Sequence, residues 1–157
     1  MIRRIDQTFS LEEWQARDLS EEDKTLIQAA HRACKSAYSP YSKFNVGSAV
    51  RLEDGTLVLG SNQENAAYPS GLCAERVAFF SAGAQHAGKR IVAAAVVTDS
   101  SMPVEDFSPC GGCRQVMLET EERQSEAIRF LMQAGDSSVL VSDSVGQFLP
   151  LSFKLPR

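Results

Sequence analysis

Hydrophobic and polar positions along the first half of the chain predict a helix followed by a hairpin. Residues 20–38 carry apolar residues at helical spacing, and they begin with a serine and three acidic residues, the form of a capping box. A Ser-Pro pair at 39–40 is expected to end this helix. Residues 44–52 and 56–59 are rich in apolar residues and are joined through an Asp-Gly turn, which predicts two antiparallel strands.

The second half of the chain alternates between helical and strand-like patterns. Residues 73–87 are rich in alanine and predict a buried helix, whereas residues 91–98 form a nearly continuous apolar run that is typical of a strand covered on both faces. Residues 113–124 predict a third helix, and residues 128–132 and 139–141 predict two short strands. A hairpin followed by alternating helices and strands predicts an α/β fold with a mixed sheet between layers of helices.

Residues 1–20 do not continue this pattern, because they are charged and carry only scattered apolar residues. We predict an N-terminal extension at 1–20, with one helical turn starting at Ser10, and a single folded domain at 21–157. A chain of 157 residues is an ordinary length for one domain.

The net charge and composition of the chain indicate which class of ligand it binds. The chain has 16 basic and 20 acidic residues, a formal net charge of −4, whereas nucleic-acid binders usually present a basic surface. A small ligand is therefore favoured over a polynucleotide. The sequence has no apolar run that approaches the ~20 residues of a membrane span, and its first residues do not form a signal peptide, so we expect a cytoplasmic protein with no membrane partner.

Three of the four cysteines lie where helices are expected to begin. Cys73 opens the helix at 73–87, and Cys110 and Cys113 form a Cys-x-x-Cys pair at the start of the next helix. Helix N-termini stabilise thiolates, and three thiolates on zinc leave the fourth tetrahedral position open, as catalytic sites require. A water molecule in that position is acidified and becomes a nucleophile near neutral pH.

Charged neighbours complete this constellation. Glu75 lies two residues after Cys73, where it can take a proton from the water and deliver it to a ring nitrogen and then to a leaving amine. Arg76 is expected to donate a hydrogen bond to a ligand sulfur, and Arg76 and Arg114 together to offset the negative charge of the thiolates. Three cysteines with one non-ligand glutamate match the pattern of zinc deaminases.

Four segments, in their order and spacing, resemble the cytidine deaminases of the small homotetrameric class: residues 37–44, 60–68, 73–76 and 109–115. The resemblance implies a three-layer α/β/α fold with a five-stranded mixed sheet and one zinc ion per subunit. It implies hydrolytic deamination of cytidine and 2′-deoxycytidine in pyrimidine salvage, in a homotetramer whose active sites are shared between subunits.

The resemblance also assigns roles in substrate binding. Asn62 and Glu64 would bind ribose hydroxyls, Phe44 would flank the base, and the backbone of Ala74 would contact the base carbonyl. It makes Cys73, Cys110 and Cys113 the zinc ligands, Glu75 the proton shuttle, and Gln115 a residue behind the ligands.

Two further regions are assigned, one to a contact between subunits and one to a lid over the site. The resemblance places Ala67 and Tyr68 at the site across a subunit boundary. The C-terminal Leu-Pro segment matches a segment that closes the site in relatives, and Phe153 is the aromatic residue expected to act as the lid.

Other interpretations of single features stay open. The cysteines could form a structural zinc site with Cys34, His31 or His86 as a fourth ligand, or Cys110 and Cys113 could form a redox pair. Taken alone, the glutamate after Cys73 would only complement a helix dipole. For the whole chain, the alternatives are deamination of another aminopyrimidine such as blasticidin S, base editing in a polynucleotide, and a non-catalytic zinc-stabilised binding module.

Overall fold

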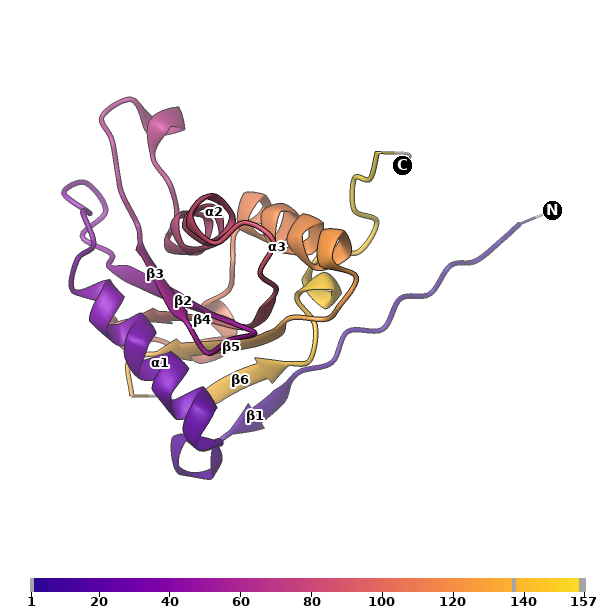
Figure 1. The fold of residues 1–157 in the computed structure, drawn as a ribbon, viewed down its shortest axis with the longest axis horizontal. Helices are drawn as coiled ribbons and strands as arrows, with labels where there is room; N and C mark the ends of the chain where they lie inside the picture. The colour runs from indigo at the N-terminus through magenta and orange to yellow at the C-terminus, as the bar shows by residue number, and fades with distance from the viewer. Residues whose placement is uncertain (1, 137, 156–157) are drawn as a thin grey trace.

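The computed structural model describes residues 2–136 and 138–155 and contains a mixed sheet with three α-helices (Figure 1). The helices are α1 (Glu21–Cys34), α2 (Ala74–Gln85) and α3 (Gly111–Gln124). The strands are β1 (Glu12–Trp14), β2 (Val46–Leu52), β3 (Leu57–Ser61), β4 (Ile91–Thr98), β5 (Arg129–Ala134) and β6 (Val139–Ser142). Short 3-10 turns named η1 (Ala16–Asp18), η2 (Tyr68–Ser70), η3 (Val104–Asp106) and η4 (Val145–Phe148) join them. The predicted α/β class is confirmed.

The sheet has the order β1-β6-β5-β4-β2-β3 and is mixed. Its central strand, β4, pairs antiparallel with β2 and parallel with β5, and α3 provides the crossover that a parallel pair needs. The remaining pairs are antiparallel. Helix α3 thus follows the central strand β4, whereas α2 follows β3, which lies at one edge of the sheet.

The expected count of five strands is wrong by one, because residues 12–14 add a sixth strand at the β6 edge. The helical turn expected at Ser10 is not formed for the same reason: Glu12–Trp14 are extended and pair with residues 139–141. Trp14 is partly buried against the core on the α1 side of the sheet. The sheet edge thus fixes a conformation that the local capping pattern did not predict.

The three layers are visible in Figure 1, where α1 covers one face of the sheet and α2 and α3 cover the other. Alternate residues of β4 point to opposite faces of the sheet. Ala94 and Val96 pack in the core under α2 and α3. The residues that pack in the core under α1 are Ala93, Ala95 and Val97. This explains why the strand is apolar throughout its length.

Local signals explain most of the element boundaries. The Ser20 hydroxyl accepts a 3.1 Å hydrogen bond from the Asp23 backbone N–H, so the predicted N-cap of α1 is confirmed. The helix ends at Cys34, earlier than the Ser-Pro pair at 39–40. β3 continues through Gly60 to Ser61, two residues beyond the predicted end of this strand at residue 59. Gly60 is part of the strand because it pairs with Ser48.

Gly60 lets α2 approach the sheet. A Cβ atom at this position would lie 2.4 Å from both the Ala74 carbonyl oxygen and the Ala78 backbone nitrogen. We therefore expect Gly60→Ala to lower the free energy of unfolding by about 2–3 kcal/mol, because α2 carries Cys73 and Glu75 and cannot move away freely.

Chemical denaturation measures this loss, and Gly83→Ala in α2 is the matched control. A Cβ atom at Gly83 meets nothing within 4 Å, so alanine there should leave stability unchanged or raise it by up to about 1 kcal/mol. Equal stability of the two variants would show that α2 does not depend on this close approach.

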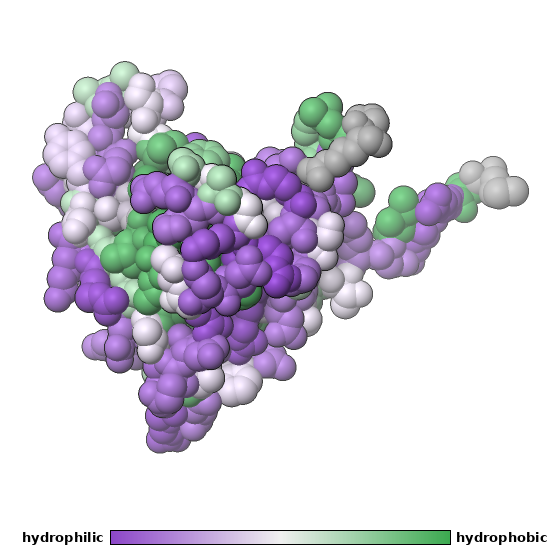
Figure 2. All heavy atoms as spheres, in the orientation of Figure 1, coloured by the Kyte–Doolittle hydropathy of each residue, from purple (hydrophilic) through white to green (hydrophobic). Residues whose placement is uncertain are grey.

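Figure 1 shows the described part of the N-terminal segment extending away from β1 and the described part of the C-terminal segment leaving the sheet after η4. Hydrophobic residues mark both terminal segments in Figure 2. The exposed large hydrophobic residues of these segments are Ile2, Ile5, Phe9, Leu151, Phe153 and Leu155. Among the described residues, no helix is long and apolar enough to cross a membrane.

Candidate active site

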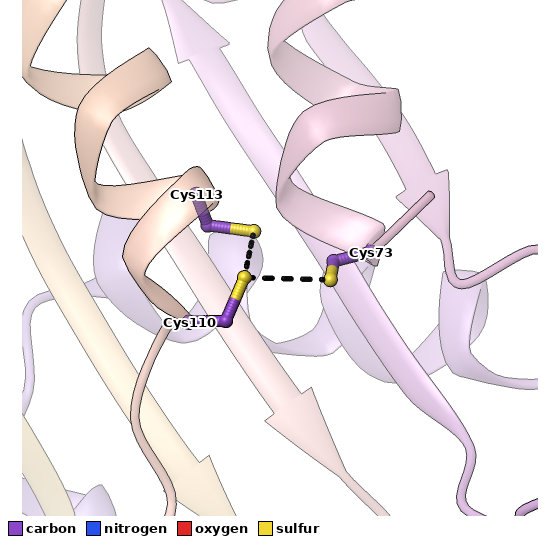
Figure 3. A group of neighbouring side chains, drawn as sticks. All are labelled: Cys73, Cys110 and Cys113. Atoms are coloured by element: carbon purple, nitrogen blue, oxygen red, sulfur yellow. Dashed lines mark hydrogen bonds between the residues drawn. The ribbon is translucent and has the colours of Figure 1, made fainter. Parts of the chain in front are cut away.

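Two helix N-termini meet on one face of the sheet and bring three thiols together (Figure 3). Cys73 is the N-cap of α2, Cys110 is the N-cap of α3, and Cys113 lies in the first turn of α3. The Sγ atoms of Cys73 and Cys110 are 3.7 Å apart, and those of Cys110 and Cys113 are 3.5 Å apart. The positive ends of both helix dipoles therefore act on the same group of sulfurs.

The donor set fits zinc. Tetrahedral bonds of about 2.3 Å from zinc to sulfur place two sulfurs about 3.8 Å apart, close to the observed separations. Among the described residues, this is the group of histidine, cysteine and acidic side chains whose donor atoms converge within 4.8 Å. Three protein ligands leave one tetrahedral position for water or substrate, as in catalytic zinc sites.

The surroundings favour ionised sulfur at Cys73. Hydrogen bonds with the Cys113 thiol and with the Arg76 guanidinium lower the pKa of Cys73 to about 5. Arg76 Nη2 lies 3.8 Å from the Cys73 sulfur, in the position predicted for a donor behind a ligand. The same interaction with Cys73, together with burial, raises the pKa of Cys113. A divalent cation bound among the sulfurs would displace the remaining thiol protons.

Glu75 lies in the first turn of α2 beside this cluster, and its side chain is 5% exposed. Burial disfavours the charged carboxylate and, with the negative charge of Cys73, raises the pKa of Glu75 to about 7. A carboxyl group in such a place can exchange a proton with a group in the cavity that it lines.

Arg114 makes different contacts from those predicted. Its guanidinium nitrogens donate to the Pro109 carbonyl at 2.7 Å, the Phe148 carbonyl at 3.2 Å and the Ser108 hydroxyl at 2.9 Å. It therefore holds the backbone that precedes Cys110 and does not act on the sulfurs through these bonds.

A cavity of about 780 Å³ opens in front of the cysteines. Its wall includes residues from the turn after α1, from the end of β3 and from the segment before α3. The predicted site residues that line it are Phe44, Asn62, Glu64, Tyr68, Cys73, Glu75, Arg76 and Cys110. A volume of this size accommodates a nucleoside.

Asn62 and Glu64 are held by backbone groups. The Asn62 side chain accepts a bond from the Val46 N–H at 2.8 Å and donates one to the Phe44 carbonyl at 2.9 Å. Glu64 Oε2 accepts bonds from the N–H groups of Tyr41 at 2.9 Å and Ser42 at 3.2 Å. Hydrogen bonds from Ser42 hold the pKa of Glu64 below its ordinary value, so its carboxylate is a charged acceptor.

An aromatic wall, only half predicted, closes one side of the cavity. Phe44 is partly buried, and its ring centroid lies 6.3 Å from that of Phe107. Phe107, Ser108 and Met102 also line the cavity, although no sequence pattern predicted them as site residues. They follow the end of β4, and only the position of that strand beside β2 brings them to Phe44.

Of the residues assigned to a subunit contact or to the lid, Tyr68 lines the cavity, whereas Ala67 and Phe153 do not. Ala67 and Tyr68 are exposed, Tyr68 at 79%, and they lie on the loop around η2 that projects beyond α2 in Figure 1. The Phe153 side chain is 70% exposed and does not line the cavity, although its carbonyl accepts a 3.2 Å bond from Gln115. Ala74, by contrast, is fully buried at the start of α2.

The other candidate ligands lie elsewhere. Cys34 is buried in the core on the α1 side, and His31 forms a 2.9 Å hydrogen bond with Gln133. His86 caps the far end of α2. The four cysteines are free thiols, so Cys110 and Cys113 are not joined as a disulfide. The structural zinc site with a fourth ligand from this set is thus not formed.

Comparison with known proteins places the same segments in a known group. Residues 20–127 match the family described as "Cytidine and deoxycytidylate deaminase zinc-binding region". A cytidine deaminase of Halalkalibacterium halodurans is 42% identical over 119 residues, which cover 75% of this chain and 86% of that protein. One from Sporosarcina psychrophila is 50% identical over 94 residues, covering 60% of this chain and 66% of that protein.

Solved structures agree with this relationship. A cytidine deaminase from Burkholderia pseudomallei superposes with a TM-score of 0.72 at 39% identity, over 86% of this chain and 100% of that one. The enzyme from Mycobacterium tuberculosis gives a TM-score of 0.64 at 32% identity, over 87% of this chain and 100% of that one. The likeness therefore extends over most of the sheet and its helices.

Proposed function

Because this chain belongs to the cytidine and deoxycytidylate deaminase family, we infer that it is a zinc-dependent cytidine deaminase. It hydrolyses cytidine and 2′-deoxycytidine to uridine and 2′-deoxyuridine with release of ammonia, a reaction of pyrimidine salvage. The observation that carries this inference is the convergence of three thiols and the buried Glu75 on one nucleoside-sized cavity.

Cys73, Cys110 and Cys113 are the residues that would hold the zinc ion. When bound, zinc supplies the Lewis acidity that makes water nucleophilic near neutral pH. Glu75 accepts a proton from the attacking water and returns it to the ring nitrogen beside the reacting carbon. A second proton transfer through Glu75 lets the amine leave as ammonia, while the water oxygen becomes the uracil carbonyl. Burial excludes bulk water from this proton exchange.

We place the sugar at the Asn62 and Glu64 side of the cavity and the base between Phe44 and the metal site. The Glu64 carboxylate, fixed by two backbone N–H groups, accepts a hydrogen bond from a ribose hydroxyl. The Asn62 amide is aligned by its own two bonds to the start of β2. The Ala74 backbone contacts the base carbonyl, and the Phe44 ring packs on the face of the base.

The assembly that we propose is a homotetramer with shared active sites. It is supported by the exposed apolar side chains of Leu59 and Phe80, which lie on β3 and α2, and by the hydrophobic surface of Figure 2. In it, Ala67 and Tyr68 reach a neighbouring site, and Phe153 closes one. Sedimentation equilibrium tests the assembly, and a monomer at assay concentration would contradict it.

We assign catalysis to a domain at 21–157 and treat residues 1–20 as an extension whose β1 segment completes the sheet edge. A cytoplasmic location fits a site built on free thiols, which a reducing compartment preserves.

The test of function is conversion of cytidine by the purified, zinc-loaded chain, followed by its ultraviolet spectrum and by ammonia release. We expect kcat/KM for cytidine in the range of about 10⁴–10⁶ M⁻¹s⁻¹. Blasticidin S, cytidine monophosphate and a cytidine-containing oligonucleotide serve as competing substrates. A folded, zinc-loaded chain that leaves cytidine unchanged contradicts the proposal, and conversion of one competitor in its place would identify the correct substrate class.

A further inference from the structure

The turn η4 near the C-terminus is hydrogen-bonded to the C-terminal half of α3 through one carboxylate, that of Glu121. Glu121 Oε1 accepts bonds from the Ser144 hydroxyl at 2.6 Å and the Gly146 N–H at 3.2 Å. Its Oε2 accepts bonds from the N–H groups of Ile128 at 2.8 Å and Val145 at 3.1 Å. A single side chain therefore satisfies two backbone donors of η4, the hydroxyl of its N-cap Ser144, and the Ile128 N–H that precedes β5.

Arg114 forms a hydrogen bond with the other end of η4. It lies at the N-terminal end of α3, beside the cysteines. Its Nη1 donates to the Phe148 carbonyl, the last residue of η4. Its Nε donates to the Pro109 carbonyl, which precedes Cys110, and its Nη2 donates to Ser108, which lines the substrate cavity. One guanidinium thus joins η4 to the segment that carries a metal ligand.

Helix geometry makes this a continuous brace. Arg114 and Glu121 are seven residues apart, so they lie two turns apart on the same face of α3. Leu118 lies between them and is buried, and η4 packs closely enough that a Cβ atom on Gly146 would lie 2.7 Å from Glu121 Oε1 and 3.3 Å from Leu118 Cδ1. The turn therefore lies directly on this face.

Cys110 needs such support more than the other two ligands. Like Cys73, it precedes a helix and its side chain makes no capping hydrogen bond, but it alone of the three cysteines is exposed, so the backbone of residues 108–110 sets the place of its sulfur. The planar guanidinium can hold three acceptors in fixed directions, which the single ammonium of lysine cannot reproduce.

We propose that Arg114 is a positioning residue for the metal site, which holds Cys110 in place by bracing Ser108 and Pro109 against η4, with Glu121 as the anchor of that brace. The inference rests on the metal site of the proposed function but not on the identity of the substrate.

The test compares zinc-loaded wild type with Arg114→Met, Arg114→Lys and Glu121→Gln. We expect Arg114→Met to release zinc to a chromogenic chelator about 10–100-fold faster, the usual effect of removing a residue that orients a metal ligand. We expect kcat to fall by a similar factor while KM for cytidine changes little, and the ligand-field bands of the cobalt-substituted protein to shift. Glu121→Gln loses one charged acceptor oxygen. It should speed zinc release, lower kcat and shift the cobalt bands in the same directions as Arg114→Met, but each to a smaller extent.

Arg123→Met is the matched control, because Arg123 lies in the last turn of the same helix and is exposed. It should keep wild-type zinc release and cobalt bands. A folded Arg114→Met protein with wild-type release and bands overturns the proposal. If that variant does not fold, Arg114→Lys decides: faster release supports the brace, and wild-type release overturns it. Chelator release is independent of turnover, so a failed cytidine assay leaves this test intact.

Discussion

Replacing Glu75 by glutamine is expected to lower kcat for cytidine by about 10⁴-fold while leaving one zinc ion per chain in place. Glutamine preserves the volume of this 5% exposed side chain but cannot accept or return a proton. The three sulfurs do not require Glu75 as a ligand, since they converge without it. The expected result is thus a folded, metal-loaded chain without proton transfer.

The measurement pairs steady-state kinetics with zinc analysis, and Glu21→Gln is the control. Both glutamates lie in the first turn of a helix, so both substitutions remove a similar interaction with a helix dipole. Glu21 is exposed, and within residues 2–136 and 138–155 its carboxylate forms an ion pair with Lys24, so its replacement should leave kcat unchanged. Similar, small losses of kcat in the two variants would mean that Glu75 only stabilises the N-terminus of its helix.

Much of the fold could be predicted because it depends on short-range signals. The apolar run at 91–98 predicted both the limits of β4 and its central place, since a strand covered on both faces is apolar along nearly its whole length. The strand β1 could not be predicted in this way. Residues 12–14 have a polar, cap-like sequence, and they are extended because β6 offers an unpaired edge 125 residues away. Local pattern carries no information about such a partner.

The site residues, too, could be predicted where they depend on short-range signals and not where they depend on contacts between distant segments. The cysteines and Glu75 could be predicted because their spacing places them at helix starts, and helix geometry then fixes their relative positions. The role of Arg114 could not, because its acceptors include the Phe148 carbonyl, 34 residues along the chain, and a backbone carbonyl leaves no mark in the sequence. Phe107 was missed because its contact with Phe44 depends on the pairing of β2 with β4.

Replacing Cys113 by alanine should abolish deamination and leave zinc well below one ion per chain. Cys113 is fully buried in the first turn of α3, and its loss leaves two sulfur ligands, one of them on an exposed residue. Two thiolates cannot complete the three-ligand set of a catalytic zinc site, so we expect metal affinity to fall by at least about 10²-fold. Zinc analysis after dialysis measures the metal, and the cytidine assay measures the function.

Cys34→Ala separates loss of a ligand from loss of a buried side chain. Cys34 is 2% exposed in the opposite core, where alanine leaves a similar small gap, so both variants should lose about 1 kcal/mol of stability through packing. Only Cys113→Ala should also lose zinc. If it does not fold, Cys110→Ala at the exposed N-cap gives the same comparison. Full zinc content in a folded Cys113→Ala or Cys110→Ala protein would remove that residue from the ligand set, because a true three-sulfur site has no spare ligand.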